Sequence, residues 1–205
     1  ATDILEELWS RDPSNEYLRF SYFLRYQQLV LLWIYQGDEQ AARVGLARIQ
    51  EDAELGETAT EPGVRELKYQ LDQRLVQAIW FLRRNELSSM RNALNRVDEL
   101  LQDLDWEQNR GEGEHVRLVL VRYLQWIADG EQTMSRASLD QLRHHRPAGT
   151  IRSCNSALAD ARLAVMEGDS AAVQQIVEWL MERRFSAPEF QDFIRRHGIE
   201  TRNSG

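Results

Sequence analysis

Histidine and cysteine are the side chains best suited to metal binding or nucleophilic catalysis, and the chain has four histidines and one cysteine. No histidine stands in the HExxH spacing with which one helix face binds zinc. His144 and His145 come at the expected end of a helix, where positive charge is favourable. Cys154 has no flanking histidine or asparagine pattern, so we expect a buried, apolar role for it. The sequence predicts neither a bound metal nor a cofactor.

Carboxylates gather in two segments, but neither has the spacing of a catalytic or nucleotide-binding motif. Residues 111–114 (GEGE) lack the GK[ST] ending of a phosphate-binding loop, and their acids would repel phosphate. Residues 98–107 (DELLQDLDWE) lack a DDxxD spacing and are typical of a solvated helix end. We therefore expect a protein that is not an enzyme, with a helical enzyme built around an apolar cavity as a lesser alternative.

Charge and hydropathy narrow the classes of partner. The formal net charge of −8 argues against direct contact of this segment with nucleic acid, since phosphate backbones carry the same sign. The longest apolar run, residues 29–35, is far shorter than the roughly 18–20 residues that span a membrane. A single cysteine favours a reducing compartment, so we expect a cytoplasmic location. The start at Ala1, without methionine, suggests a processed form or a fragment of a larger regulator.

The elements that must position any site are helices. Apolar residues recur at steps of three and four in residues 17–35, 64–82 and 115–128. No run alternates with period two over enough length to indicate a sheet, and segments rich in helix breakers separate the apolar runs. The sequence therefore predicts an all-α fold.

One pattern recurs four times: an apolar helix, a corner residue that tolerates positive φ, an acidic residue, and a second helix. The corner residues are Gly37, Asn85, Gly130 and Gly168. In three of the four copies an aromatic residue stands four positions before the corner. In all four copies small or apolar residues stand 5, 9 and 12 positions after the corner. A tight corner needs Gly or Asn, and the acid suits the positive end of the next helix. One hairpin cannot cover its own apolar face, so the hairpins are predicted to stack.

The first hairpin resembles the tetratricopeptide repeat, which combines large residues on the first helix, a tight corner and a small residue early in the second helix. The matching residues are Tyr26, Leu29, Trp33, Gly37, Asp38, Ala42 and Leu46. The chain departs from the family at Arg74 and Arg122, where large apolar side chains are usual, and at Val173, which replaces a small residue. The corners are 48, 45 and 38 residues apart, against about 34 in the family. Such long repeats also resemble the helical superhelix domain of bacterial signal-transduction ATPases and maltose-activator-type transcription regulators.

The resemblance implies an α-solenoid of about four helix-turn-helix, TPR-like repeats with flanking helices. Residues 1–13 are expected to form an N-terminal flanking helix, residues 14–184 the repeat array, and residues 185–205 a C-terminal capping helix and tail. The expected hairpins cover about 14–55, 62–104, 113–145 and 150–184.

In such an array the first helix of each hairpin lines the concave surface. The predicted partner-binding residues on this face are Gln27, Leu31, Ile34, Leu75, Ile79, Arg83, Leu120, Leu124 and Arg162. Because this line is mostly apolar, two interpretations stay open: plain core of a tightly curled array, or a groove for an amphipathic helix or another subunit. The N-terminal segment, with Ile4, Leu5 and Leu8, is a candidate for such a helix supplied in cis.

These features favour a non-catalytic protein–protein interaction or sensory module, as a domain of a bacterial transcription regulator or assembly factor. The expected partner is another protein or an amphipathic helix or peptide, and self-association is possible for an exposed apolar face. The resemblance to the signal-transduction regulators adds a small-molecule inducer as a candidate ligand. A peptide- or helix-binding adaptor or chaperone of a secretion or pilus system is the alternative.

Overall fold

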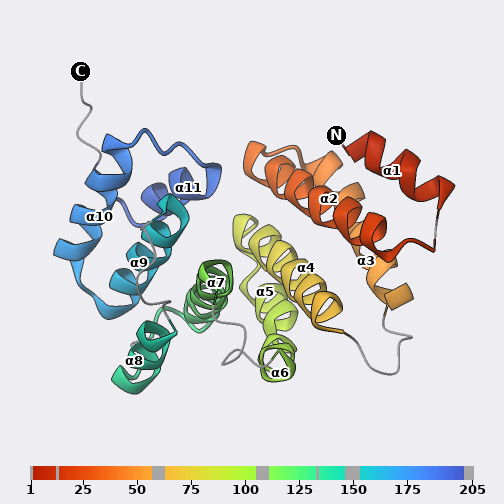
Figure 1. The fold of residues 1–205 in the computed structure, drawn as a ribbon. Helices are drawn as coiled ribbons and strands as arrows, with labels where there is room; N and C mark the ends of the chain where they lie inside the picture. The colour runs from red at the N-terminus through yellow and green to blue at the C-terminus, as the bar shows by residue number, and fades with distance from the viewer. Residues whose placement is uncertain are drawn as a thin grey trace. The chain divides into compact units, whose positions relative to one another are not determined.

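The computed structural model describes residues 2–12, 14–56, 63–104, 111–132, 134–145 and 153–200. These residues form eleven α-helices and no strand, which confirms the predicted all-α class (Figure 1). The chain divides into two compact units, residues 1–104 and 105–205, and each is described by itself. Within the described ranges, no helix is long and apolar enough to cross a membrane.

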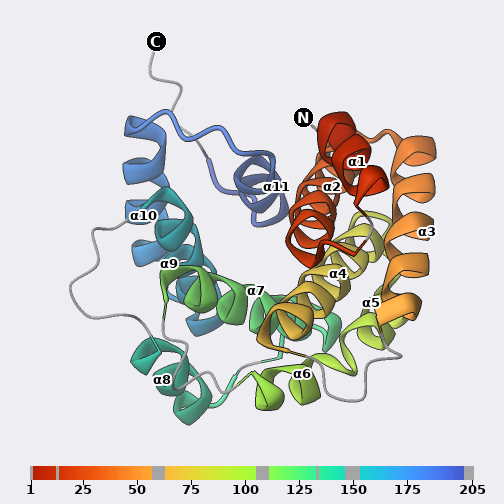
Figure 2. The same cartoon turned by 45° about the vertical axis from the view of Figure 1, so that its right-hand side comes forward.

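The helices of the first unit are α1 (Thr2–Arg11), α2 (Glu16–Gln36), α3 (Glu39–Gly56), α4 (Val64–Arg83), α5 (Leu87–Leu94) and α6 (Val97–Asp103). Helix α2 packs against α3 and α4, and α4 also packs against α3, α5 and α6 (Figure 2). The centre of this unit is apolar and closed to solvent at Tyr22, Val30, Ile49, Leu71 and Met90. Two hairpins, α2–α3 and α4–α5/α6, are therefore joined through their first helices.

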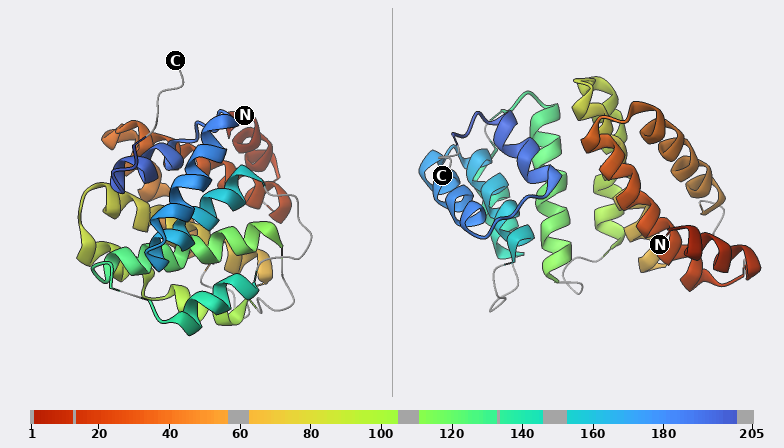
Figure 3. Two further views of the ribbon diagram at one scale, coloured as in Figure 1. Left: turned by 90° about the vertical axis from the view of Figure 1, so that its left-hand side faces the viewer. Right: turned by 90° about the horizontal axis from the view of Figure 1, so that it is seen from above.

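The helices of the second unit are α7 (Glu112–Ala128), α8 (Arg136–His144), α9 (Cys154–Glu167), α10 (Ser170–Glu182) and α11 (Pro188–Arg196). Helix α9 packs between α7 and α10, and α8 contacts α7 (Figure 3). In α11, Phe190 and Phe193 are buried, and the ring of Phe193 lies 6.2 Å from that of Tyr123 on α7. The C-terminal helix thus covers apolar surface of its unit.

The four predicted corners share a positive φ at the corner residue and one backbone hydrogen bond, and at the third corner the next residue, Glu131, has positive φ as well (60°). The φ angles are 78° at Gly37, 58° at Asn85, 80° at Gly130 and 75° at Gly168. In each copy the residue after the corner donates its N–H to the carbonyl five positions earlier, at Trp33, Phe81, Trp126 or Ala164, over 2.9–3.0 Å. This left-handed helix end satisfies carbonyls that the helix itself leaves open. The predicted left-handed conformation is therefore present at all four corner residues.

Two hairpins differ from the predicted pattern after the corner. The second helix of the second hairpin is interrupted at Asn95 and Arg96, which separate α5 from α6. This segment contains Ser and Asn residues, whose side chains compete for the backbone and weaken a helix. In the third hairpin α8 begins only at Arg136, because Ser135 caps it by accepting the N–H of Ser138. Ser135 is therefore a cap and does not occupy the interior helix position that its offset predicted.

Helix α1 packs on α2 through a residue that the sequence analysis did not select. The ring of Trp9 lies 5.8 Å from that of Tyr22 and 5.4 Å from that of Phe23. Ile4 and Leu8, expected to fill a groove, are 64% and 41% exposed. Leu5, the third residue of the expected apolar stripe, is half-buried, and Trp9 supplies the aromatic contacts between α1 and α2.

An ion pair also joins α1 to the first hairpin. Arg48 of α3 donates to the carboxylate of Glu6 over 2.6 Å, and its guanidinium lies 5.4 Å from the ring centres of both Tyr22 and Tyr26. The bond to Glu6 raises the pKa of Arg48, so the arginine stays charged. The expected N-terminal flanking helix is present as α1; residues 1, 13 and 201–205 of the expected flanking segments lie outside the described residues.

Candidate ligand pocket in the first unit

Most residues of the predicted concave face lie inside the core of their unit. Gln27, Ile34, Leu75, Ile79, Leu124 and Arg162 are buried; Leu31 and Leu120 are half-buried, and Arg83 is exposed. The side-chain amide of Gln27 donates to the carbonyl of Tyr69 over 3.4 Å, which links α2 to α4. The burial fits the core alternative, because packing of first helix on first helix covers these side chains. A partner-binding role remains a prediction for Arg83, Leu31 and Leu120.

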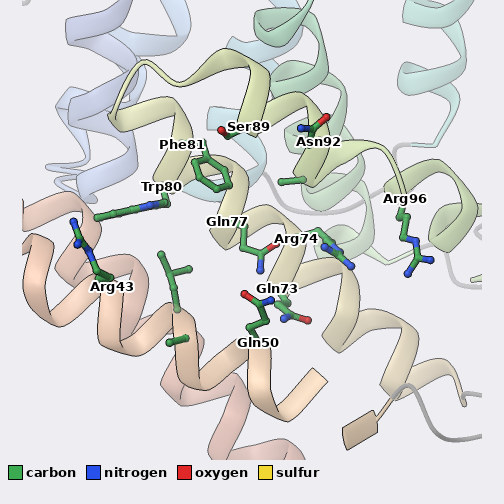
Figure 4. Close-up of a pocket in the computed structure, with 13 residues that line it drawn as sticks. Arg43, Gln50, Gln73, Arg74, Gln77, Trp80, Phe81, Ser89, Asn92 and Arg96 are labelled. Carbon is green, nitrogen blue, oxygen red and sulfur yellow. The ribbon is translucent and has the colours of Figure 1, made fainter. Parts of the chain in front are cut away.

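A different surface of the first unit forms a pocket of about 710 Å³ between α3, α4 and α5 (Figure 4). Its lining is Arg43, Leu46, Ala47 and Gln50 of α3; Gln73, Arg74, Gln77, Trp80 and Phe81 of α4; Ser89, Asn92 and Ala93 of α5; and Arg96 between α5 and α6. The pocket belongs to two consecutive hairpins, since α3 ends the first and α4 begins the second.

Each wall of the pocket is one face of a helix. On α4 the lining side chains Gln73, Gln77 and Phe81 follow one another at steps of four, so they project on the same side. The lining residues of α3 and of α5 recur at steps of three and four in the same way. Gln73 is buried, and its amide donates to the carbonyl of Ile49 over 3.2 Å, which holds α4 against α3 beneath the pocket.

The pocket is positively charged although the chain as a whole is negative. Three arginines, Arg43, Arg74 and Arg96, belong to the lining, and none of the thirteen lining residues is acidic. Within the described part of the chain, Arg43 and Arg74 have no ion-pair partner. Arg84, just outside the lining, instead bonds to Glu86 over 2.7 Å and to Glu39 over 3.0 Å. The lining therefore contains two arginines, Arg43 and Arg74, whose charge no ion pair within the described residues neutralises.

Amide and aromatic groups complete the lining. Figure 4 shows Gln50, Gln73 and Gln77 gathered at the centre, with Arg43 and Trp80 toward one end of the pocket and Arg96 toward the other. Amides offer both donors and acceptors, and guanidinium groups donate in a planar fork that suits carboxylates and phosphates. Among the described lining residues Ser89 is the only one with a hydroxyl, and none of them is a histidine, cysteine, lysine or carboxylate that could activate it. This composition is suited to binding an anion through hydrogen bonds.

The residues selected for chemistry in the sequence do not form a site. His144 and His145 end α8, as predicted, whereas Cys154 is half-buried because it opens α9. Sequence inspection missed that Glu112 and His115 lie three apart on α7; Ser153 donates its hydroxyl to Glu112. Among the described residues, no group of three or more His, Cys, Asp or Glu side chains is placed to hold a metal ion.

The second unit contains one polar pair inside an aromatic cluster. The Tyr123 hydroxyl lies 2.6 Å from Nε2 of His197, and Tyr123 stacks on Trp126 at 6.0 Å between ring centres. Burial raises the pKa of Tyr123 to about 12 and lowers the pKa of His197 below its ordinary 6.5. Both groups are therefore neutral at neutral pH, and their hydrogen bond fastens the end of α11 to α7.

None of the pocket residues was among the predicted site residues. Arg74 carried the one available signal, since it stands where the repeat family has a large apolar side chain. Comparison of the chain with protein-family profiles, curated proteins and solved structures gives no match. The chemistry of the pocket is accordingly the basis for the functional proposal.

Proposed function

We propose that the protein is a non-catalytic interaction module, an α-solenoid of TPR-like hairpins that binds a partner protein in the pocket between α3, α4 and α5. The observation that carries this proposal is the composition of the pocket: arginines without acids, a group of amides, and no side chain able to act as a general base. Such a lining can hold an anionic partner but has little means of transforming it.

The helix contacts within each unit support a repeat array. In the first unit α2 packs on its hairpin partner α3 and on α4, the first helix of the next hairpin. In the second unit α9 packs on its partner α10 and on the preceding first helix, α7. First helices that pack in sequence are the arrangement by which stacked hairpins bury their apolar faces. A partner in the pocket would contact two repeats at once.

The resemblance to bacterial signal-transduction regulators supports a more specific role. In that role the module belongs to a cytoplasmic transcription regulator or assembly factor, and occupation of the pocket reports the presence of its partner. A site shared by consecutive hairpins suits this role, because a ligand that bridges two repeats changes the stability of their interface.

Site-specific photo-crosslinking in cells of the source organism tests the proposal. A photoreactive amino acid replaces Gln77, inside the pocket, or Gln102, which is exposed on α6 and outside the lining. We expect one partner, identified by mass spectrometry, to be crosslinked from position 77 only, and to be lost when Arg74→Glu is added. The purified partner should then bind the chain in calorimetry.

Equal crosslinking from positions 77 and 102 would contradict a partner site in the pocket. Turnover of a substrate that persists in purified protein and disappears with Ser89→Ala would contradict the non-catalytic role, because Ser89 carries the only hydroxyl among the thirteen lining residues that the structure describes.

A further inference from the structure

We propose that the pocket takes an extended acidic segment of the partner, about four residues long, with carboxylates held by the pocket arginines and an apolar side chain against Trp80. This inference rests on the proposed function, since it names the chemistry of the partner at the same site.

The charge of the pocket selects an anion. The chain carries 33 acidic and 25 basic residues, so arginines that form no ion pair are not the expected outcome of a random surface. Arg43 and Arg74 nevertheless have no ion-pair partner within the described residues, and they share the pocket with Arg96. Like charges in one pocket repel each other, and a ligand carboxylate removes that repulsion while forming charge-assisted hydrogen bonds.

The amides select an extended backbone. A helical ligand satisfies its own N–H and C=O groups, whereas an extended segment presents both kinds of group to its surroundings. Gln50, Gln77 and Asn92 line the pocket with side chains that can donate and accept at the same time. This pairing of side-chain amides with free backbone groups favours extended chain over the amphipathic helix expected from the sequence.

The dimensions of the pocket set the length of the segment. Its lining on α4 runs from Gln73 to Phe81, which corresponds to about 12 Å at 1.5 Å per helical residue. Extended chain advances by roughly 3.3 Å per residue, so about four residues match this length. The volume of about 710 Å³ is within the range of sites that enclose small ligands.

The aromatic wall adds a preference for one apolar residue. Trp80 and Phe81 come from α4, and Leu46 faces the same space from α3. Figure 4 shows Arg43 and Trp80 toward the same end of the pocket, so a carboxylate and an apolar side chain of the ligand would both bind at that end. The ligand is therefore acidic with an internal aromatic or aliphatic residue.

A short peptide fits the charge of the whole protein better than a nucleic acid does. The net charge of −8 repels a long polyanion, because many phosphates approach the acidic surface at once. A four-residue segment is only about 12 Å long, so few of its charges reach beyond the pocket toward the acidic surface, where charges are screened over roughly 8 Å at physiological salt.

Fluorescence anisotropy with a defined peptide tests this inference. The probe is fluorescein-labelled Glu-Phe-Asp-Glu-amide, and its control is the uncharged Gln-Phe-Asn-Gln-amide. We expect saturable binding of the acidic peptide by the full chain, weakened by added salt, and at least tenfold weaker binding of the control. Arg74→Gln should weaken binding of the acidic peptide by about tenfold, because the substitution removes a charged hydrogen-bond donor.

The matched variant is Arg25→Gln, an exposed arginine of α2 that bonds to Gln28 and does not line the pocket. It should bind the peptide as the unchanged chain does, and far-UV circular dichroism should show equal helix content in both variants. Equal binding of the two peptides, or equal affinity of Arg74→Gln and Arg25→Gln, would overturn the acidic-segment proposal.

Phosphate-bearing probes separate the remaining possibilities. Tighter binding of inorganic phosphate or of a tetrathymidylate than of the acidic peptide would also overturn the proposal and assign the pocket to phosphate. If the peptide fails while the crosslink from position 77 still identifies a partner, the ligand class is wrong and the interaction role stands. If the peptide does not bind and the crosslink from position 77 identifies no partner, both the acidic-segment proposal and the proposed interaction role are wrong.

Discussion

Replacement of Gly130 by alanine should destabilise the second unit, whereas replacement of Gly113 on the same helix should stabilise it. Gly130 has φ +80°, and a Cβ built there meets nothing within 4 Å. Any loss of stability at this corner must therefore come from the backbone. Gly113 lies in the first turn of α7, and its Cβ would approach only Nη1 of Arg117, at 3.7 Å. That distance is an ordinary contact, so the position can accept alanine.

The magnitudes follow from the two backbone conformations. A left-handed conformation costs an L-residue about 1–2 kcal/mol, and the smaller entropy of the unfolded alanine chain returns about 0.4–1 kcal/mol. Gly130→Ala should therefore lower the free energy of unfolding by about 1 kcal/mol. Gly113→Ala should raise it by about 0.5–1 kcal/mol, since alanine is the better helix former.

Thermal and urea unfolding, followed by far-UV circular dichroism, measure both effects. For a unit of this size, 1 kcal/mol corresponds to a shift in Tm of roughly 4–8 °C. The two variants should therefore move Tm in opposite directions. Stabilisation by both alanines, or no effect at Gly130, would show that this corner is not left-handed and would refute the reasoning about the repeat.

Three further substitutions test packing, capping and titration. Gly45→Leu should destabilise by about 1–3 kcal/mol in urea unfolding, because a Cβ there lies 2.5 Å from Cγ2 of Val30; an unchanged midpoint would exclude this close approach of α2 and α3. Asp169→Ala should lower the free energy of unfolding by about 1 kcal/mol, because the side chain no longer accepts the 2.9 Å hydrogen bond from the N–H of Ala172. Asp169→Asn, which keeps an acceptor, should have most of the original stability in urea unfolding. Burial holds the pKa of His197 below 6.5 in the folded state, so its contribution to stability is present above pH 6.5 and is lost as the pH falls below that value. In His197→Gln, urea midpoints should depend less on pH across this window; an unchanged pH dependence would contradict burial of the imidazole.

The corners were predictable from the sequence because they depend on local chemistry. Gly37 and Gly168 adopt the left-handed conformation that the tight turn requires, and Asn85 is the residue type that tolerates it best after glycine. An acid follows each corner, and Asp169 caps α10 as its position suggested. Each of these features involves residues close in the chain, so periodicity and residue type were sufficient.

The predicted concave face depended on contacts between distant residues. The apolar stripe of each first helix is visible in the sequence, but the neighbour that covers it is not. Ile34 and Leu124 are therefore equally consistent with an exposed groove and with a buried core when only the sequence is considered. In the structure, first helices pack on one another and both side chains are buried. Likewise, the choice of Trp9 as the contact of α1 depends on the aromatic rings of α2.

The pocket was harder to predict because its lining resembles a solvated surface when each helix is considered alone. Gln50 and Asn92 are ordinary exposed-face residues on helices far apart in sequence. Only the packing of α3 and α5 on α4 brings them together. Arg74 was visible as a departure from the repeat family, but its significance depends on Arg43 and Arg96, which no local pattern connects to it.

The interpretation as a repeat requires a left-handed corner in each of the four hairpins, and the pocket between α3, α4 and α5 requires the two corners of the first unit, at Gly37 and Asn85. Backbone NMR of the isotope-labelled chain tests this directly through scalar couplings and Cα chemical shifts at Gly37, Asn85, Gly130 and Gly168. The structure predicts positive φ at all four, each following a helical segment. Negative φ at any of these four residues, or an extended segment before one of them, would contradict the interpretation of the chain as a repeat of helical hairpins.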